Sequence, residues 1–158
     1  MTPVRLLCVE SDAGFGLLYQ ALLRSHGFSV DLATDSSSVF ELLHSSQIGG
    51  ALTAHDLQVR EGEIGSFELA VECKRRLAGL PVVILSDCES VVEEARNFVD
   101  GAINKSAPLE ILVELMRSLT GFRPAHKPFF FHPVDVSMRL PGPVSRPRVE
   151  PARFPLAS

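Results

Sequence analysis

The chain has 158 residues, of which 46% are hydrophobic and 22% charged, a composition that fits one soluble globular domain with its own core. No apolar run is long enough to span a bilayer, the N-terminus lacks a secretory pattern, and the three cysteines have no metal-like spacing, so we expect a cytoplasmic protein with reduced cysteines and no membrane partner. The net charge of −4 divides into +4 for residues 122–158 and −8 for the rest, which argues against a body that binds nucleic acid.

Strands and helices alternate along the first three quarters of the chain. A buried strand at 4–9 is followed by an acidic turn, in which Ser11 or Asp12 is placed to cap the next helix. Gly27 ends that helix, and the alternating segment 28–33 predicts a second strand. One face of the first helix is predicted from four residues at helical spacing: Phe15, Leu18, Leu22 and Ser25.

The later segments continue this alternation. A short helix around 39–43 leads to a third strand at 51–55, and Ser66 is placed to cap a third helix that stops at Gly79. Strands alternating with helices predict an α/β fold: a doubly wound, five-stranded parallel sheet flanked by helices, within a domain at 1–121. The remaining elements are predicted as a strand at 81–85, a helix at 89–98, a strand at 101–104 and a helix from Pro108 to Gly121.

The composition changes at residue 122. Eight of the eleven prolines lie in 122–158, and no helical or strand period survives there. We therefore expect a Pro-rich tail that is extended or disordered, rather than a second domain. Three consecutive phenylalanines at 129–131 are the exception, since they could dock on the domain or on a partner.

Polar side chains follow the predicted strands at one edge of the sheet. Glu10 and Asp12 follow the first strand, Asp56 the third, Ser86 the fourth and Lys105 the fifth. Because the carboxyl ends of parallel strands meet at one edge, we expect these groups to converge. Such a set suits a phosphoryl group, which a carboxylate accepts, a divalent cation held by oxygen ligands neutralises, and a lysine pairs with.

These segments resemble the receiver domain of two-component response regulators, the CheY-like family, whose fold is flavodoxin-like. Residues 6–12 resemble the family's apolar strand with its acidic pair, and Asp56 resembles the phosphoacceptor. Residues 80–86 resemble the fourth strand with its switch hydroxyl, and 101–108 the segment with the lysine. The resemblance covers 4–121 and is carried by four motifs in order.

The resemblance implies a single-domain receiver in bacterial phosphorelay signalling that is not an enzyme. Asp56 would accept phosphate from a histidine kinase or a phosphotransfer protein, and Ser86 and Lys105 would bind the phosphoryl oxygens. Mg²⁺ would be held by Glu10, Asp12 and Asp56. A downstream protein would read the face formed by the fourth helix, fifth strand and fifth helix, and a homodimer is left open.

Two positions depart from the family pattern. Ser11 stands at the usual position of the second acid, and Ala102 stands at the position of the aromatic switch. These departures leave an alternative open, in which the domain is a pseudo-receiver that binds partners without being phosphorylated. His55 is interpreted as a partly buried structural residue, because strand alternation aims it away from Asp56.

The sequence does not favour an enzyme. An aspartyl phosphatase would carry a second acid two residues after its nucleophile, where this chain has Gln58. A serine hydrolase would need a Gly-x-Ser-x-Gly elbow, which is missing. Nucleotide or flavin binding would need a phosphate-cradling loop after the first strand, where the acidic turn 10–12 would repel a phosphate.

Overall fold

The structure is a computed structural model that describes residues 3–122. Strands and helices alternate through that range, as predicted, and each helix joins one strand to the next. The elements are β1 Arg5–Val9, α1 Ala13–Ser25, β2 Ser29–Ala33, α2 Ser36–Ser45, β3 Gly50–Ala54, α3 Ser66–Arg76, β4 Val82–Ser86, α4 Glu89–Ala95, β5 Gly101–Asn104 and α5 Leu109–Thr120.

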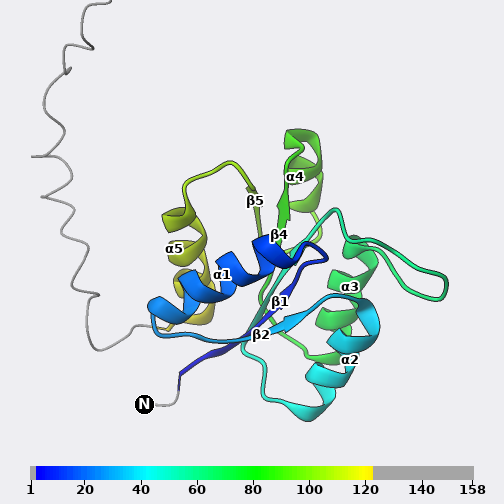
Figure 1. The fold of residues 1–158 in the computed structure, drawn as a ribbon, viewed down its shortest axis with the longest axis horizontal. Coiled ribbons are helices and arrows are strands. Elements are labelled where there is room, and N and C mark those ends of the chain that lie inside the picture. Colours follow the sequence, from blue (N-terminus) through cyan, green and yellow to red (C-terminus); the bar gives the residue numbers. More distant parts are fainter. Residues whose placement is uncertain (1–2, 123–158) are drawn as a thin grey trace, which may run out of the picture. The chain divides into compact units, whose positions relative to one another are not determined.

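The five strands form one parallel sheet in the order β2-β1-β3-β4-β5 (Figure 1). Val9 pairs with Thr53 and Ala54 with Leu85, so β1, β3 and β4 end side by side at one edge. The strand order changes direction between β1 and β3, which is where doubly wound sheets place their ligand sites. The predicted fold class is therefore confirmed.

Two apolar layers enclose the sheet, because side chains alternate between its faces along each strand. Leu7 and Val9 belong to the layer that α2 and α3 cover, whereas Leu6 and Cys8 belong to the layer of α1 and α5. The two pairs of helices lie on opposite faces of the sheet (Figure 1). Burial of these layers is the main stabilising contribution to the fold.

The buried face of α1 differs from the predicted one. Phe15 and Leu18 are 40% and 44% exposed, so the face they mark does not lie in the core. The predicted face did not include Tyr19, which is only 3% exposed. It also did not include Gly16, which is buried but has no side chain to mark an apolar position. The helix is turned by one residue relative to the prediction, and its buried residues are Gly16, Tyr19 and Leu23.

Two predicted helix ends are also wrong. The helix α4 has seven residues and ends at Ala95, because Asn97 and Phe98 donate to carbonyls three residues back in tighter turns. Ser66 is the first residue of α3 rather than its cap, which is Gly65. The Ser66 hydroxyl instead donates to the carbonyl of His55 at 3.1 Å and ties α3 to the end of β3.

Within residues 3–122, no helix is long and apolar enough to cross a membrane. The predicted tail, 122–158, lies outside the described residues except for Phe122. The ring of Phe122 packs on that of Phe28, with 4.8 Å between the ring centroids. The core of the domain thus extends one residue beyond the predicted boundary.

Candidate functional site

The ammonium of Lys105 lies at the centre of the predicted edge. Its Nζ is 2.8 Å from Asp56 Oδ1 and 3.2 Å from Glu10 Oε2. The side chains of Lys105 and Glu10 are 3% and 2% exposed, whereas that of Asp56 is 61% exposed. The structure therefore brings together the residues after β1, β3 and β5, and leaves the Asp56 carboxylate open to solvent.

Backbone hydrogen bonds that extend past the strand ends fix these three positions. The N–H of Glu10 donates to Ala33 at 3.0 Å, and the N–H of Lys105 donates to Ser86 at 2.9 Å. The N–H of His55, directly before Asp56, donates to a β4 carbonyl at 2.7 Å. The side chains are thus held by the sheet itself, which is a rigid support for a site.

The charges of Lys105 and Asp56 stabilise each other. Burial raises the pKa of Asp56, but the hydrogen bond and the charge of Lys105 outweigh it and hold this pKa below its usual range. Burial lowers the pKa of Lys105, but the hydrogen bond to Asp56 and the charge of Glu10 raise it above the usual value. Asp56 is therefore a carboxylate at neutral pH, the form that acts as a nucleophile.

Phe15 covers Lys105 and was not predicted to belong to the site. The centroid of its ring is 4.9 Å from Nζ, and the ring stacks on Tyr19 at 6.0 Å. An aromatic face attracts a cation, so the ring helps to hold the ammonium in place. The available signal was its position in the first turn of α1, which begins at the same edge of the sheet.

Ser86 lies at this edge with its hydroxyl engaged. The residue is 4% exposed, and its Oγ accepts a hydrogen bond from the N–H of Cys88 at 3.1 Å. The turn into α4 thus depends on the same hydroxyl that was predicted to bind a phosphoryl group.

Ala102 and His55 both lie on the side of the sheet that α2 and α3 cover. Ala102 packs against that layer from β5, so no aromatic side chain occupies the switch position. His55 is partly buried, and its ring meets that of Phe67 edge-on with 5.3 Å between the centroids. The structural interpretation of His55 agrees with this packing.

The predicted metal ligands are engaged in other contacts. Glu10 accepts hydrogen bonds from the Asp12 N–H at 3.0 Å through Oε1 and from Lys105 through Oε2. Asp12 Oδ1 accepts from the Phe15 N–H at 3.0 Å, as the N-cap of α1. Across residues 3–122, no group of three or more His, Cys, Asp or Glu side chains is arranged to hold a metal. As they lie, the three carboxylates do not fit Mg²⁺, which needs several free oxygen ligands, and magnesium binding stays a prediction.

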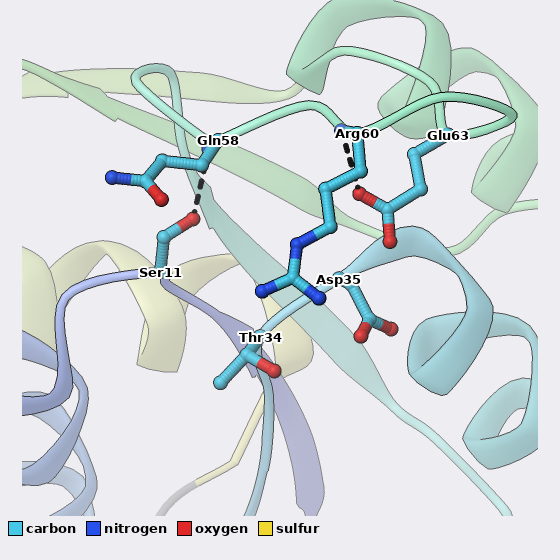
Figure 2. Close-up of a pocket in the computed structure, with 6 residues that line it drawn as sticks. All are labelled: Ser11, Thr34, Asp35, Gln58, Arg60 and Glu63. Atoms are coloured by element: carbon cyan, nitrogen blue, oxygen red, sulfur yellow. Dashed lines mark hydrogen bonds between the residues drawn. The ribbon is translucent and has the colours of Figure 1, made fainter.

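A hollow of about 80 Å³ lies beside Ser11. Ser11 Oγ accepts a hydrogen bond from the N–H of Gln58 at 3.0 Å, and the N–H of Arg60 donates to Glu63 at 3.0 Å. The Arg60 guanidinium points toward the opposite wall of the hollow (Figure 2). Hydrogen bonds from Ser38 and the charge of Arg60 lower the pKa of a carboxyl on that wall, Asp35. The lining residues are Ser11, Thr34, Asp35, Gln58, Arg60 and Glu63.

Comparison with curated protein sequences finds similarity to a response regulator. No protein-family model matches the chain. The response regulator MprA of Mycolicibacterium vanbaalenii is 28% identical over 120 residues, which cover 74% of this chain and 50% of that protein. The chain thus spans about half the length of this relative.

Solved receiver domains share the fold. A response regulator receiver protein from Sinorhizobium medicae gives a TM-score of 0.67 at 20% identity and covers 77% of this chain and 98% of its own. A CheY-like receiver domain from Methanospirillum hungatei gives 0.63 at 17% identity, covering 75% and 94%. The strand order, the edge built from Glu10, Asp56 and Lys105, and these relatives agree. The chain therefore has the fold of CheY-like response regulator receiver domains and is similar in sequence to a response regulator.

Proposed function

We propose that this receiver domain is a phosphorylation-dependent switch whose phosphoacceptor is Asp56. The observation that carries the proposal is the contact of Asp56 with Lys105, in which a solvent-open carboxylate is paired at 2.8 Å with a nearly buried ammonium. The pairing keeps the carboxylate ionised. It also places a positive charge where the oxygens of an incoming phosphoryl group would gather.

The proposed transfer uses groups at this edge and a phosphodonor. A carboxylate oxygen of Asp56 attacks the phosphorus of a phosphohistidine or a small acyl phosphate. A P–O bond to Asp56 forms as the donor's P–N or P–O bond breaks. With phosphohistidine, the electron pair leaves with the imidazole, which takes up a proton. With an acyl phosphate, the electron pair leaves with the carboxylate of the donor. Lys105 offsets the charge on the phosphoryl oxygens. Ser86 donates its O–H to them, which it can do while its oxygen accepts the N–H of Cys88.

The partners follow from this chemistry. The donor is a histidine kinase or a phosphotransfer protein, and the output is a protein that reads the face of α4, β5 and α5. We propose no enzymatic activity for the domain. Cys8, Cys73 and Cys88 are free thiols, which supports a location in the reducing cytoplasm.

Incubation with acetyl phosphate tests the proposal. Intact-mass measurement is expected to show one added phosphoryl group on the wild type and none on Asp56→Asn. Asp87→Asn is the matched control, because Asp87 is an exposed aspartate just after β4 at the same edge. Labelling that survives Asp56→Asn would overturn the assignment. A wild type that takes no label from any donor would favour the alternative, a pseudo-receiver that works without phosphorylation.

A further inference from the structure

Both oxygens of Glu10 and one oxygen each of Asp12 and Asp56 already accept hydrogen bonds from internal donors. Lys105 supplies an ammonium to both Asp56 and Glu10, and its side chain is only 3% exposed. The second oxygen of Glu10 accepts the N–H of Asp12. A divalent cation that used the bonded oxygens would have to compete with the ammonium of Lys105 and the N–H of Asp12 for them.

The side chain of Ser11 binds the protein backbone rather than a cation. Ser11 Oγ accepts the N–H of Gln58, two residues after Asp56, so the hydroxyl joins the end of β1 to the turn that follows the phosphoacceptor (Figure 2). A serine brings no charge. It acts as a positioning residue for this turn rather than as a cation ligand.

A second cation lies on the same turn. Arg60 lines the hollow next to Ser11, and its guanidinium makes no hydrogen bond or ion pair with any residue in 3–122 (Figure 2). Its charge acts on the surroundings, since it lowers the pKa of Asp35 in addition to the hydrogen bonds from Ser38. A positive charge beside position 11 repels a divalent cation, and a neutral side chain at that position does not attract one.

We propose that this edge of the sheet disfavours divalent cations: Lys105 and Arg60 supply its positive charge, and Ser11 fixes the turn after Asp56. The inference rests on the proposed function for its biological meaning, because it says that phosphoryl binding at Asp56 relies on these internal cations. Its physical content is the affinity of the free domain for a metal ion.

Calorimetric titration of the full chain with Mg²⁺ tests the inference. Ser11→Asp is expected to bind Mg²⁺ at least tenfold more tightly than the wild type, and Arg60→Gln to bind it several-fold more tightly. Ser90→Asp is the matched control, because it adds an acid to the exposed first turn of α4, which takes no part in the Ser11–Gln58 contact. It is expected to leave the affinity within about twofold, since the charge of an exposed acid is screened over roughly 10 Å. A wild type that binds as tightly as Ser11→Asp would overturn the inference, as would equal gains from Ser90→Asp.

The positioning role of Ser11 has its own measurement. Ser11→Ala is expected to speed hydrogen exchange at the Gln58 amide, and Ser11→Thr, which keeps the hydroxyl, to restore protection. Unchanged exchange in Ser11→Ala would overturn this role. Acetyl phosphate labelling of the wild type separates the two proposals: absence of label defeats the phosphoacceptor assignment, while the metal titration decides the present one independently.

Discussion

At the scale of single residues, the site depends on the ammonium of Lys105. It lies between Glu10, which is buried, and Asp56, which is open to solvent. A buried carboxylate that loses its cationic partner is costly, because burial removes the water that would stabilise its charge. Lys105 therefore contributes to the stability of the domain as well as to the proposed phosphoryl binding.

Lys105→Met is expected to lower the free energy of unfolding by about 3 kcal/mol at neutral pH, because it leaves Glu10 buried without its partner. Folding lowers the pKa of Asp56 and raises that of Lys105. Their mutual stabilisation is thus present between about pH 4 and pH 10, and is lost as the pH falls through the folded pKa of Asp56 or rises through that of Lys105. Urea unfolding from neutral to acidic pH measures the deficit. A deficit that does not shrink as the pH falls would contradict this account.

The residues of the site differ in how far the sequence could predict them. Asp56 and Lys105 each follow a short apolar strand, and parallel strands bring such residues to one edge whatever the details of packing. The contact of Ser11 with Gln58 joins residues 47 apart in the chain and depends on the path of a loop. No period or composition encodes that path, so this contact needed the structure.

At the scale of elements, Asp12 belongs to α1 more than to a metal site. Its Oδ1 caps the helix by accepting the N–H of Phe15, and Asp35 caps α2 in the same way by accepting the N–H of Ser38 at 2.8 Å. Both carboxylates also lie at the positive end of their helix dipoles. The two helices therefore offer a direct comparison of one cap inside the site with one outside it.

Asp12→Ala is expected to lower the free energy of unfolding by about 1 kcal/mol, because the first turn of α1 loses its cap. Asp12→Ser is expected to lose less, since a hydroxyl also accepts the bond. Urea unfolding measures both variants, and Asp35→Ala provides the reference loss for a helix cap. If Asp35→Ala destabilises the domain while Asp12→Ala does not, the cap formed by Asp12 does not contribute to stability. That result would favour the predicted role of Asp12 as a metal ligand.

Strands were easier to predict than helix faces and ends. A strand such as β4 is apolar throughout because both of its faces are buried, and its five residues are all buried in the structure. The inner face of α1 was wrong by one residue because Tyr19 carries a buried ring with a polar tip. The end of α4 was wrong because local carbonyls capture the amides of Asn97 and Phe98, a choice that apolar spacing does not reveal.

At the scale of the whole domain, the strand order explains why the candidate site lies at the carboxyl edge of the sheet. All five strands run parallel, so Glu10, Asp56 and Lys105 emerge together. Helices cover both faces, which leaves the carboxyl edge as the place where strand ends, loops and helix N-termini meet. Alternation of elements predicted this arrangement, because right-handed crossovers leave few other ways to connect parallel neighbours.

The packing of the whole domain also predicts how many residues it needs to fold stably. Within residues 3–122, two apolar layers pack on the sheet, and Phe122 extends one of them against Phe28. A chain that ends at residue 125 is therefore expected to unfold cooperatively, with a free energy of unfolding within about 0.5 kcal/mol of that of the full chain.

Phe122→Ala in that shorter chain is expected to lower the free energy of unfolding by about 2 kcal/mol, because it removes buried ring surface and an aromatic pair. Phe98→Ala, at a ring that is 53% exposed, is the control and is expected to cost less. Urea unfolding of the three proteins decides the matter: a full chain that is several kcal/mol more stable than the shorter one would show that residues beyond 125 belong to the folded domain.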